Sequence, residues 1–279
     1  MPRAPRLKPP PGACDCHLHV YGESARYPWV PVKNRPFPDR RLEHYVAVRD
    51  RLGLARTVIV QATHYATDNR CLLDSVAALG ANGRGIGVVD PAISDDALAA
   101  LHAGGVRGLR FGLDLANGMQ PGALEDMAAR IAPFGWHIQY RCWPEELLDL
   151  EARFRKLPVP VCFDHMANIA PDAGGAGHPA FKALLRLLDA GNAWVKLSAP
   201  YQLSRTGGPD YADYLPQGLA FVKAAPERMV WGTNWPHPRV ADNPEEADLL
   251  DVLLDWTGGD AKTLQAILVD NPARLYGFA

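Results

Sequence analysis

Histidine and amide side chains stand at the ends of three apolar runs in this sequence. His17 and His19 are two residues apart, His165 follows Val-Cys-Phe-Asp, and Asn234 lies within Trp-Gly-Thr-Asn-Trp-Pro-His-Pro. An imidazole exchanges protons near neutral pH and also binds divalent metal ions. An asparagine amide donates and accepts hydrogen bonds, but it cannot take a proton at neutral pH. The predicted catalytic residues are therefore His17, His19, His165 and Asn234.

Arginine and hydroxyl side chains occupy similar positions. Arg110 and Arg141 each end an apolar run, and Arg205 comes a few residues after another. A guanidinium pairs with a carboxylate through two parallel hydrogen bonds, so these arginines favour an acidic ligand. Neighbouring hydroxyl groups would donate further hydrogen bonds. The predicted substrate-binding residues are Thr63, Arg110, Tyr140, Arg141, Ser198, Tyr201 and Arg205.

Eight short runs, most of them rich in β-branched or aromatic residues, are the predicted strands that position these side chains. Amphipathic stretches separate them, and a repeated strand-then-helix order is typical of parallel strands with crossover helices. Eight such units favour a closed (β/α)₈ TIM barrel, and no Gly-x-Gly-x-x-Gly follows the first run. The predicted strands are 13–20, 57–62, 85–89, 108–112, 136–140, 159–164, 193–198 and 229–232.

The barrel gives the candidate residues a common location. Active sites of such barrels lie at the C-terminal ends of the strands. Residues two apart on a strand face the same side, so His17 and His19 are both expected to point into the barrel mouth. The predicted domain is the whole chain, 1–279, with an extended arm over 1–12. Among the helices, the one after residue 242 is predicted to be capped by Asn243, with Pro244 in its first position.

Composition and charge limit the class of protein. The 29 basic and 31 acidic side chains leave a formal charge of −2, which gives no reason to expect nucleic acid or an anionic membrane as a partner. No stretch approaches the roughly 20 apolar residues of a membrane helix. Five cysteines without a Cys-x-x-Cys pair indicate reduced thiols and a cytoplasmic location. The sequence leaves open whether the chain forms a homo-oligomer.

Seven motifs resemble, in order, those of the amidohydrolase-related (amidohydrolase 2) branch of the amidohydrolase superfamily, in the group that contains 2-pyrone-4,6-dicarboxylate lactonase. The resemblance spans residues 12 to 278. It implies a distorted barrel with His17, His19 and His165 around the reacting centre, and it matches Arg110 with a carboxylate-binding arginine. The motifs are DCHLHV, HYATDN, GLRFG, FDHMA, VKLSAPYQLS, WGTNWPHP and DNPARLYGF.

Two departures from the family pattern bear on metal binding. The resemblance implies that the histidines of metal-dependent relatives bind a divalent ion. It also implies that a strand-four lysine or glutamate, a further strand-five histidine and a strand-eight aspartate help to bind it. Here Arg110 and Asn234 stand at the strand-four and strand-eight places. A guanidinium cannot ligate a metal and would repel one, and an amide lacks the negative charge that helps to retain a cation. We therefore predict no metal and no other cofactor.

The same departures shape the predicted reaction. The leading hypothesis is a hydrolase that opens a small lactone bearing a carboxylate, with Arg110 binding the acid. The resemblance implies a strand-eight aspartate as the base that activates water. Because Asn234 cannot serve, the expected base is a histidine whose pKa lies near neutrality. Three alternatives remain: a sugar-acid lactone isomerase, a metal-dependent decarboxylase, and a binding protein without activity.

Overall fold

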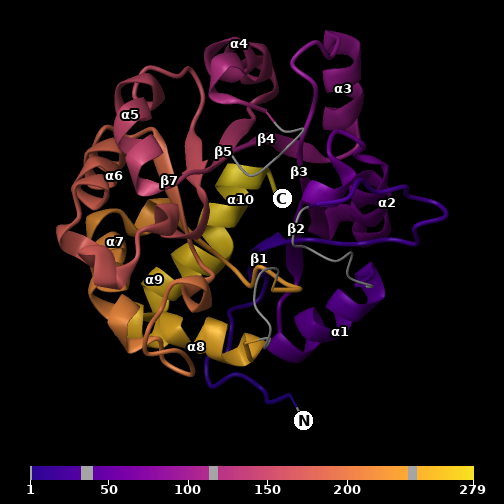
Figure 1. Cartoon of the computed structure of the whole chain (residues 1–279). Coiled ribbons are helices and arrows are strands. Elements are labelled where there is room, and N and C mark those ends of the chain that lie inside the picture. Colours follow the sequence, from indigo (N-terminus) through magenta and orange to yellow (C-terminus); the bar gives the residue numbers. More distant parts are fainter. Residues whose placement is uncertain (1, 33–39, 113–118, 238–243) are drawn as a thin grey trace.

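The structure is a computed structural model, and it describes residues 2–32, 40–112, 119–237 and 244–279. Among these residues eight parallel strands form one sheet, in which each strand pairs with the next along the chain. The strands lie at the centre, most helices form a ring around them, and the C-terminal helix lies across one end of the barrel (Figure 1). This confirms the predicted (β/α)₈ TIM barrel. The strands are β1 (Cys14–Leu18), β2 (Arg56–Val60), β3 (Gly83–Gly87), β4 (Val106–Gly112), β5 (His137–Arg141), β6 (Val161–Phe163), β7 (Ala193–Ser198) and β8 (Met229–Gly232).

The barrel closes where β8 meets β1, and the contacts run through the predicted site motifs. The backbone amide of Asn234 donates to the carbonyl oxygen of His17 at 2.7 Å. The backbone amide of His19 donates to the carbonyl oxygen of Trp235 at 2.8 Å. The two strands approach so closely that a Cβ on Gly232 would lie 2.6 Å from the His17 nitrogen. Glycine is therefore required at this position, and barrel closure itself brings Asn234 beside His17.

The helices cover the outside of the strands with their apolar faces, which form the large outer part of the core. None of the helices within the described ranges is both long and apolar enough to cross a membrane. The helices are α1 (Leu42–Leu52), α2 (Arg70–Leu79), α3 (Asp95–Ala103), α4 (Leu124–Ile131), α5 (Pro144–Phe154), α6 (Pro179–Asp189), α7 (Leu215–Ala224), α8 (Glu246–Thr257), α9 (Ala261–Gln265) and α10 (Asn271–Tyr276).

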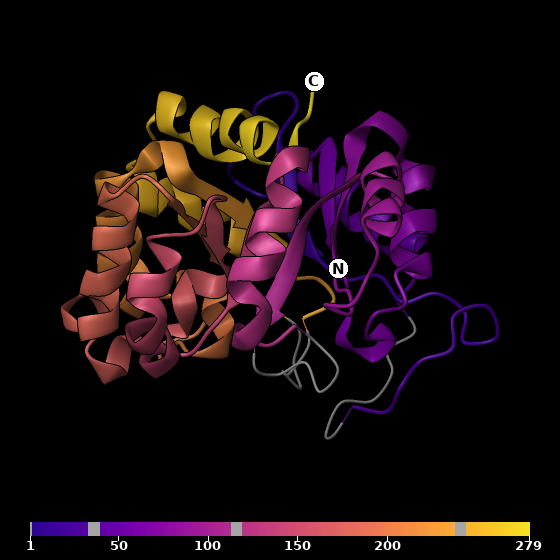
Figure 2. The same ribbon diagram turned by 90° about the horizontal axis from the view of Figure 1, so that it is seen from above.

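One end of the barrel is sealed by the C-terminal segment, which Figure 2 shows in yellow along that end. Tyr276 and Phe278 pack there against strand side chains that point into the barrel, among them Cys16, Cys162 and Trp194. This apolar floor excludes water from the N-terminal half of the barrel. The predicted catalytic residues lie in the other half of the barrel, where the strands end.

Helix α8 begins later than the sequence predicted. Asn243, the expected cap, lies outside the described residues. The helix starts at Glu246, and the side chain of Glu245 accepts a hydrogen bond from the amide of Ala247. The N-terminal arm packs against this helix, where the amide of Leu7 donates to the Asp251 carboxylate at 2.9 Å.

Candidate active site

Strand β1 delivers two buried histidines whose rings are nearly perpendicular, with centroids 5.1 Å apart. Nδ1 of His19 lies 2.9 Å from the carbonyl oxygen of Val60. Because a carbonyl only accepts, Nδ1 of His19 carries the proton and Nε2 remains an acceptor. Burial, helped by the charge of Arg110, lowers the pKa of His19 to about 3. His19 is therefore a neutral imidazole of fixed tautomer at neutral pH.

Asp15 holds the end of β1 in place from outside the barrel. Its carboxylate accepts hydrogen bonds from the amides of His17 and Thr233, each at 3.0 Å, and from the hydroxyls of Thr233 and Tyr45. These bonds tie β1 to the segment after β8 and to α1. Burial raises the pKa of Asp15 to about 6 against the opposing effect of these donors. The carboxylate thus fixes the backbone that carries His17.

His165 reaches the same centre through an unusual turn after β6. Four successive residues, from His165 to Asn168, have φ between 51° and 55°. For residues other than glycine this left-handed conformation costs about 1–2 kcal/mol each, so the surroundings must impose it. The buried amide of Asn168 helps by donating to the carbonyl of Cys142 at 2.8 Å. The turn places the His165 ring 4.7 Å from that of His17, with Nδ1 2.8 Å from the Ser198 hydroxyl.

Asn234 joins this group from the segment after β8, also with a left-handed backbone, at φ 57°. Its amide nitrogen donates to the hydroxyl of Tyr201 at 2.7 Å. The amide oxygen, Oδ1, is buried and has no hydrogen-bond partner in the described part of the chain. Asn234 therefore offers an acceptor to a water or substrate hydroxyl, and Tyr201 fixes which end of the amide is offered.

A buried ionic cluster lies directly beneath the histidines, and most of its residues are absent from the predicted site. Asp164 is fully buried between cations: Oδ2 lies 3.3 Å from Arg110, and Oδ1 lies 3.5 Å from the ammonium of Lys196. Gln139 bridges the two sides, since its amide donates to Asp164 at 3.1 Å and its oxygen accepts from Lys196 at 2.5 Å. Burial alone would raise the pKa of Asp164, but the charges of Lys196 and Arg110 hold it well below its usual value.

The alternation of side chains along a strand could have identified Lys196 and Gln139, which are absent from the predicted site. Lys196 lies two positions before Ser198 on β7, so both face the barrel interior. Gln139 lies two positions before Arg141 on β5 in the same way. A lysine or glutamine within an otherwise apolar strand is therefore a candidate for the interior, even without any motif around it.

Burial sets the protonation of the remaining two histidines. It lowers the pKa of both His17 and His165 well below the ordinary value, although Asp164 acts in the opposite direction on each. This differs from the expected histidine base with a pKa near neutrality. The physical reason is that both rings are enclosed, which penalises the charged form. Neutral imidazoles here act as hydrogen-bond donors and acceptors, and as weak bases.

The structure brings five of the seven predicted substrate-binding residues to this end of the barrel. Arg110 contacts Asp164, Ser198 contacts His165, and Tyr201 contacts Asn234. Arg141 is close enough to lower the pKa of His165 by its charge. Thr63 begins the turn that follows β2 and is half-buried there.

The other two predicted residues make their contacts away from the histidine cluster. Tyr140 alternates with Gln139, so it faces outward: its ring centroid is 4.9 Å from that of Phe154, and its hydroxyl donates to Glu146 on α5. Arg205 is exposed and pairs with Asp172 at 2.7 Å on the surface. Neither side chain has a contact with the histidine cluster in the described structure.

The charged side chains of the described cluster are positive in sum. The cations Arg110, Arg141 and Lys196 and the carboxylate of Asp164 give these four described residues a formal charge of +2 when the imidazoles are neutral. Low-dielectric walls strengthen the field of such a cluster. The arrangement can attract an acidic ligand and stabilise negative charge that develops on a bound carbonyl oxygen.

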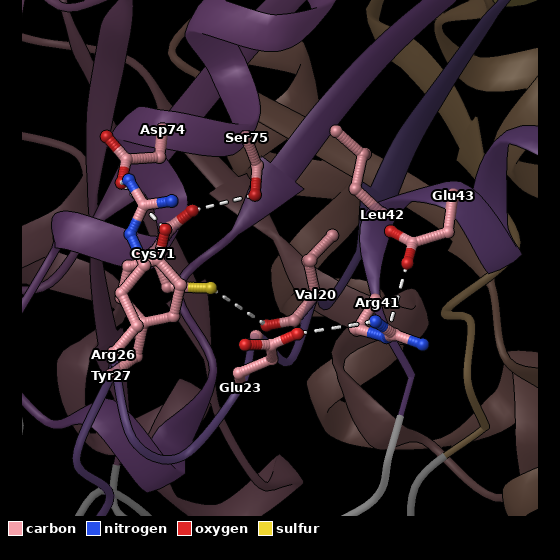
Figure 3. Close-up of a pocket in the computed structure, with 11 residues that line it drawn as sticks. Val20, Glu23, Arg26, Tyr27, Arg41, Leu42, Glu43, Cys71, Asp74 and Ser75 are labelled. Carbon is pink, nitrogen blue, oxygen red and sulfur yellow. Dashed lines mark hydrogen bonds and ion pairs between the residues drawn. The ribbon is translucent and has the colours of Figure 1, made fainter.

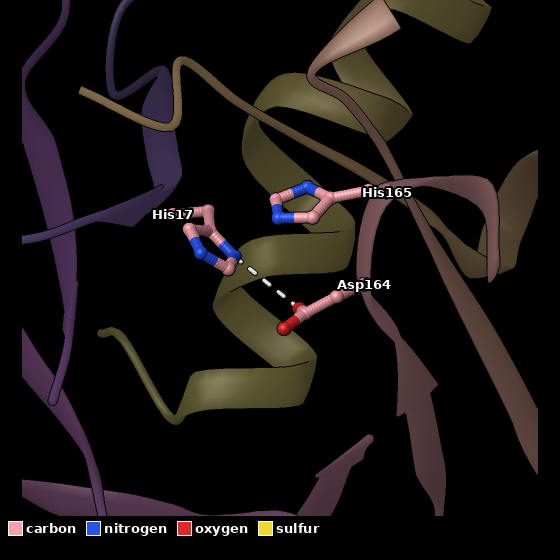
Figure 4. Close-up of side chains that lie close together, drawn as sticks. All are labelled: His17, Asp164 and His165. Atoms are coloured by element: carbon pink, nitrogen blue, oxygen red, sulfur yellow. Dashed lines mark ion pairs between the residues drawn. The ribbon is translucent and has the colours of Figure 1, made fainter. Parts of the chain in front are cut away.

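Three residues of the cluster could in principle ligate a metal ion, and Figure 4 shows them close together. His17, Asp164 and His165 each offer a ligand atom, and these atoms lie within 4.8 Å of one another. However, an ion bonded to Asp164 Oδ1 at about 2 Å would be at most about 5.5 Å from the Lys196 ammonium, which lies 3.5 Å from that oxygen. At an effective dielectric constant of about 20, this repulsion amounts to about 6 kcal/mol. The charge of Lys196 therefore opposes a divalent ion at this donor set.

A separate cavity of about 310 Å³ lies outside the barrel, between the loop after β1 and helices α1 and α2 (Figure 3). Its charged groups already pair with one another: Arg26 with Asp74 at 2.6 Å, and Arg41 with Glu23 at 3.5 Å. These pairs leave no excess of positive charge for an acidic ligand. The cluster in the barrel remains the candidate active site.

A (β/α)₈ barrel with a His-x-His pair ending β1 and a third histidine ending β6 defines the class of amidohydrolase-type barrels. The chain belongs to the amidohydrolase family, whose model matches residues 14–278. This confirms the resemblance seen in the sequence, and the protein is an enzyme of the amidohydrolase superfamily.

Named relatives cover nearly the whole chain. A 2-pyrone-4,6-dicarboxylate hydrolase of Comamonas testosteroni is 36% identical over 99% of this chain and 93% of its own length. A D-galactarolactone isomerase of Agrobacterium fabrum is 32% identical over 98% of this chain and 94% of its own length. Among solved structures, a protein of Agrobacterium tumefaciens superposes with a TM-score of 0.87 at 31% identity, with 99% of both chains covered.

Proposed function

We propose that this enzyme hydrolyses the ring ester of a small lactone that bears a carboxylate. The observation that carries the proposal is the positive cluster beneath three neutral histidines, in which Arg110 is the candidate partner of a substrate carboxylate. The relatives named as 2-pyrone-4,6-dicarboxylate hydrolase and 4-sulfomuconolactone hydrolase act on small anionic lactones by their names, and they support the same substrate class.

In the proposed reaction, water adds to the lactone carbonyl carbon and the bond to the ring oxygen breaks. Arg110 binds the substrate carboxylate, and the positive cluster stabilises the oxyanion of the tetrahedral intermediate. Asn234 Oδ1 accepts a hydrogen bond from the attacking water. His19, with Nε2 left as an acceptor, takes the proton of the attacking oxygen and returns it to the leaving ring oxygen. A weak base suits this task because that proton becomes acidic as the new C–O bond forms.

A second candidate is a lactone isomerase, and one observation favours it. The residue after β8 is Asn234, so no carboxylate stands there to activate water. In an isomerase a hydroxyl of the substrate attacks the carbonyl, and that hydroxyl is already held close to it. The 32% identical D-galactarolactone isomerase supports this candidate.

A panel of sugar-acid and pyrone lactones separates these functions. Hydrolysis releases a proton and gives an open-chain acid, whereas isomerisation gives a new lactone without net proton release. We expect proton release, followed with a pH indicator, together with an open-chain product in the NMR spectrum. A new ring without proton release would assign the isomerase. Release of carbon dioxide would indicate a decarboxylase, and saturable binding without turnover would indicate a binding protein.

Replacing Arg110 with methionine is expected to lower kcat/KM for an acidic lactone by roughly tenfold or more, because a charge-assisted hydrogen bond worth about 1.5–3 kcal/mol is lost. Arg110 also contacts Asp164 at 3.3 Å, so part of the loss could arise inside the protein. The methyl ester of the same lactone is the control, since it lacks the charge. Equal losses on acid and ester would contradict the assignment of Arg110 to the carboxylate.

We also propose that the enzyme works in the cytosol. All five cysteines are buried and unpaired, which suits a reducing compartment.

A further inference from the structure

Lys196 is a buried cation that the proposed hydrolysis does not use directly. It lies on β7 with no exposed surface, beneath the histidines. A lysine in such a place is costly unless its charge is compensated, because burial removes its hydration. Its compensation comes from Gln139 at 2.5 Å and Asp164 at 3.5 Å. Because burying the ammonium costs free energy, we expect a function of Lys196 at the neighbouring reacting centre.

The third neighbour of the ammonium is His17, whose Nδ1 lies 3.3 Å from Nζ. Asp164 Oδ1 is also near that nitrogen, at 3.2 Å. However, this carboxylate oxygen makes no hydrogen bond to any described residue, so a proton on Nδ1 would not be aimed at it. An ammonium can only donate. Nδ1 of His17 is therefore the acceptor of a hydrogen bond from Lys196.

The tautomer of His17 follows from this contact. A neutral imidazole carries one proton, and if Nδ1 accepts, that proton is on Nε2. Nε2 of His17 is buried and has no partner among the described residues. It is thus a donor with an unused hydrogen bond, which a substrate carbonyl oxygen could accept.

We propose that Lys196 is a positioning residue that supplies a permanent cation beside His17 and Asp164, and that it fixes His17 as the Nε2–H tautomer. The ammonium donates to Nδ1, and its charge keeps a metal ion away from His17, Asp164 and His165. The use of Nε2–H on a lactone carbonyl rests on the proposed function. The tautomer and the exclusion of metal do not.

The first test measures metal binding without substrate. Protein stripped on a chelating resin is titrated with Co²⁺, and the visible spectrum and equilibrium dialysis report binding. Lys196→Met keeps the bulk of the side chain but removes the charge, so this variant is expected to bind about one ion per chain. Its affinity should exceed that of the wild type by roughly 100-fold or more. Lys196→Met/His165→Asn, which lacks one ligand, should lose that binding.

Two outcomes of the titration would overturn the proposal. One is tight stoichiometric Co²⁺ in the wild-type protein at the three residues, and the other is a folded Lys196→Met that binds no more than the wild type. Lys196→Arg is the matched control: it keeps the positive charge and should bind no more metal than the wild type. Circular dichroism of each variant shows whether it is folded.

The second test uses the wild-type protein, so it does not depend on any variant folding. Two-bond ¹H–¹⁵N correlation spectra of histidine side chains distinguish a protonated from an unprotonated ring nitrogen. His17 is identified by the signal that disappears in His17→Gln. The expected pattern has a proton on Nε2 and none on Nδ1, whereas a proton on Nδ1 would refute the contact with Lys196. Lactone turnover tests the proposed function separately, since neither measurement needs a substrate.

Discussion

Asp164→Asn is expected to lower the free energy of unfolding by about 3–5 kcal/mol, since it leaves two buried cations without their counter-charge. The carboxylate lies 3.3 Å from Arg110 and 3.5 Å from Lys196, and it has no exposed surface. An amide is the same size as the carboxylate, so the loss reports charge rather than packing. Urea denaturation, followed by circular dichroism, measures the change in the midpoint.

Two comparisons show whether the loss arises from the buried cluster. The double variant Asp164→Asn/Lys196→Met removes a cation together with the anion and should recover part of the stability. The surface pair of Asp172 with Arg205 is the matched control, because exposed ion pairs contribute only about 0–1 kcal/mol. Asp172→Asn should therefore unfold close to the wild type. If Asp164→Asn unfolds at the same urea concentration as the wild type, the cluster does not carry the charges assigned to it.

Asn234→Ala is expected to reduce kcat by about 100-fold or more, comparable to the loss of a hydrogen-bonding group from an oxyanion hole. The variant loses the unpartnered Oδ1 and the bond to Tyr201 together. Tyr201→Phe removes only the second of these contacts and should cost less. Rates on one acidic lactone, measured for both variants, separate the two effects. Wild-type turnover by Asn234→Ala would show that the segment after β8 only shapes the backbone.

Asn234→Asp tests which oxygen attacks the lactone. The new carboxylate could serve as a base for water, but it would also repel an anionic substrate. If the native reaction is isomerisation, we expect isomerisation to fall while hydrolysis appears or rises. If the native reaction is hydrolysis, KM should rise because the site becomes less positive. Both rates are followed on the same lactone by NMR.

The sequence by itself determined the order and class of the elements. Eight apolar runs separated by amphipathic stretches predict a parallel barrel, because local hydrophobic periodicity reports which side of each element is buried. Strand β6, for example, lies within the predicted run 159–164. The same logic placed His17, His19, His165 and Ser198 at one end of the barrel. These residues end their strands, and all strands of a parallel barrel end on the same side.

The alternation of side chains along β5 also follows from the sequence, and it limits which residues of this strand can face the barrel interior. Tyr140 and Arg141 are adjacent on β5, so only one of them can face the interior. The structure turns Arg141 inward and packs Tyr140 against Phe154. The opposite assignment would place a guanidinium in the apolar layer between β5 and α5.

Only the tertiary structure decided which charges meet. Gln139 lies on β5, Lys196 lies on β7, and Asp164 directly follows β6. The register of the barrel brings the three side chains within 3.5 Å of one another. The depth of burial then decides protonation, because an enclosed imidazole loses the hydration that would stabilise its charge. Distances across a barrel and burial within it depend on all eight strands at once, so no local stretch of sequence contains them.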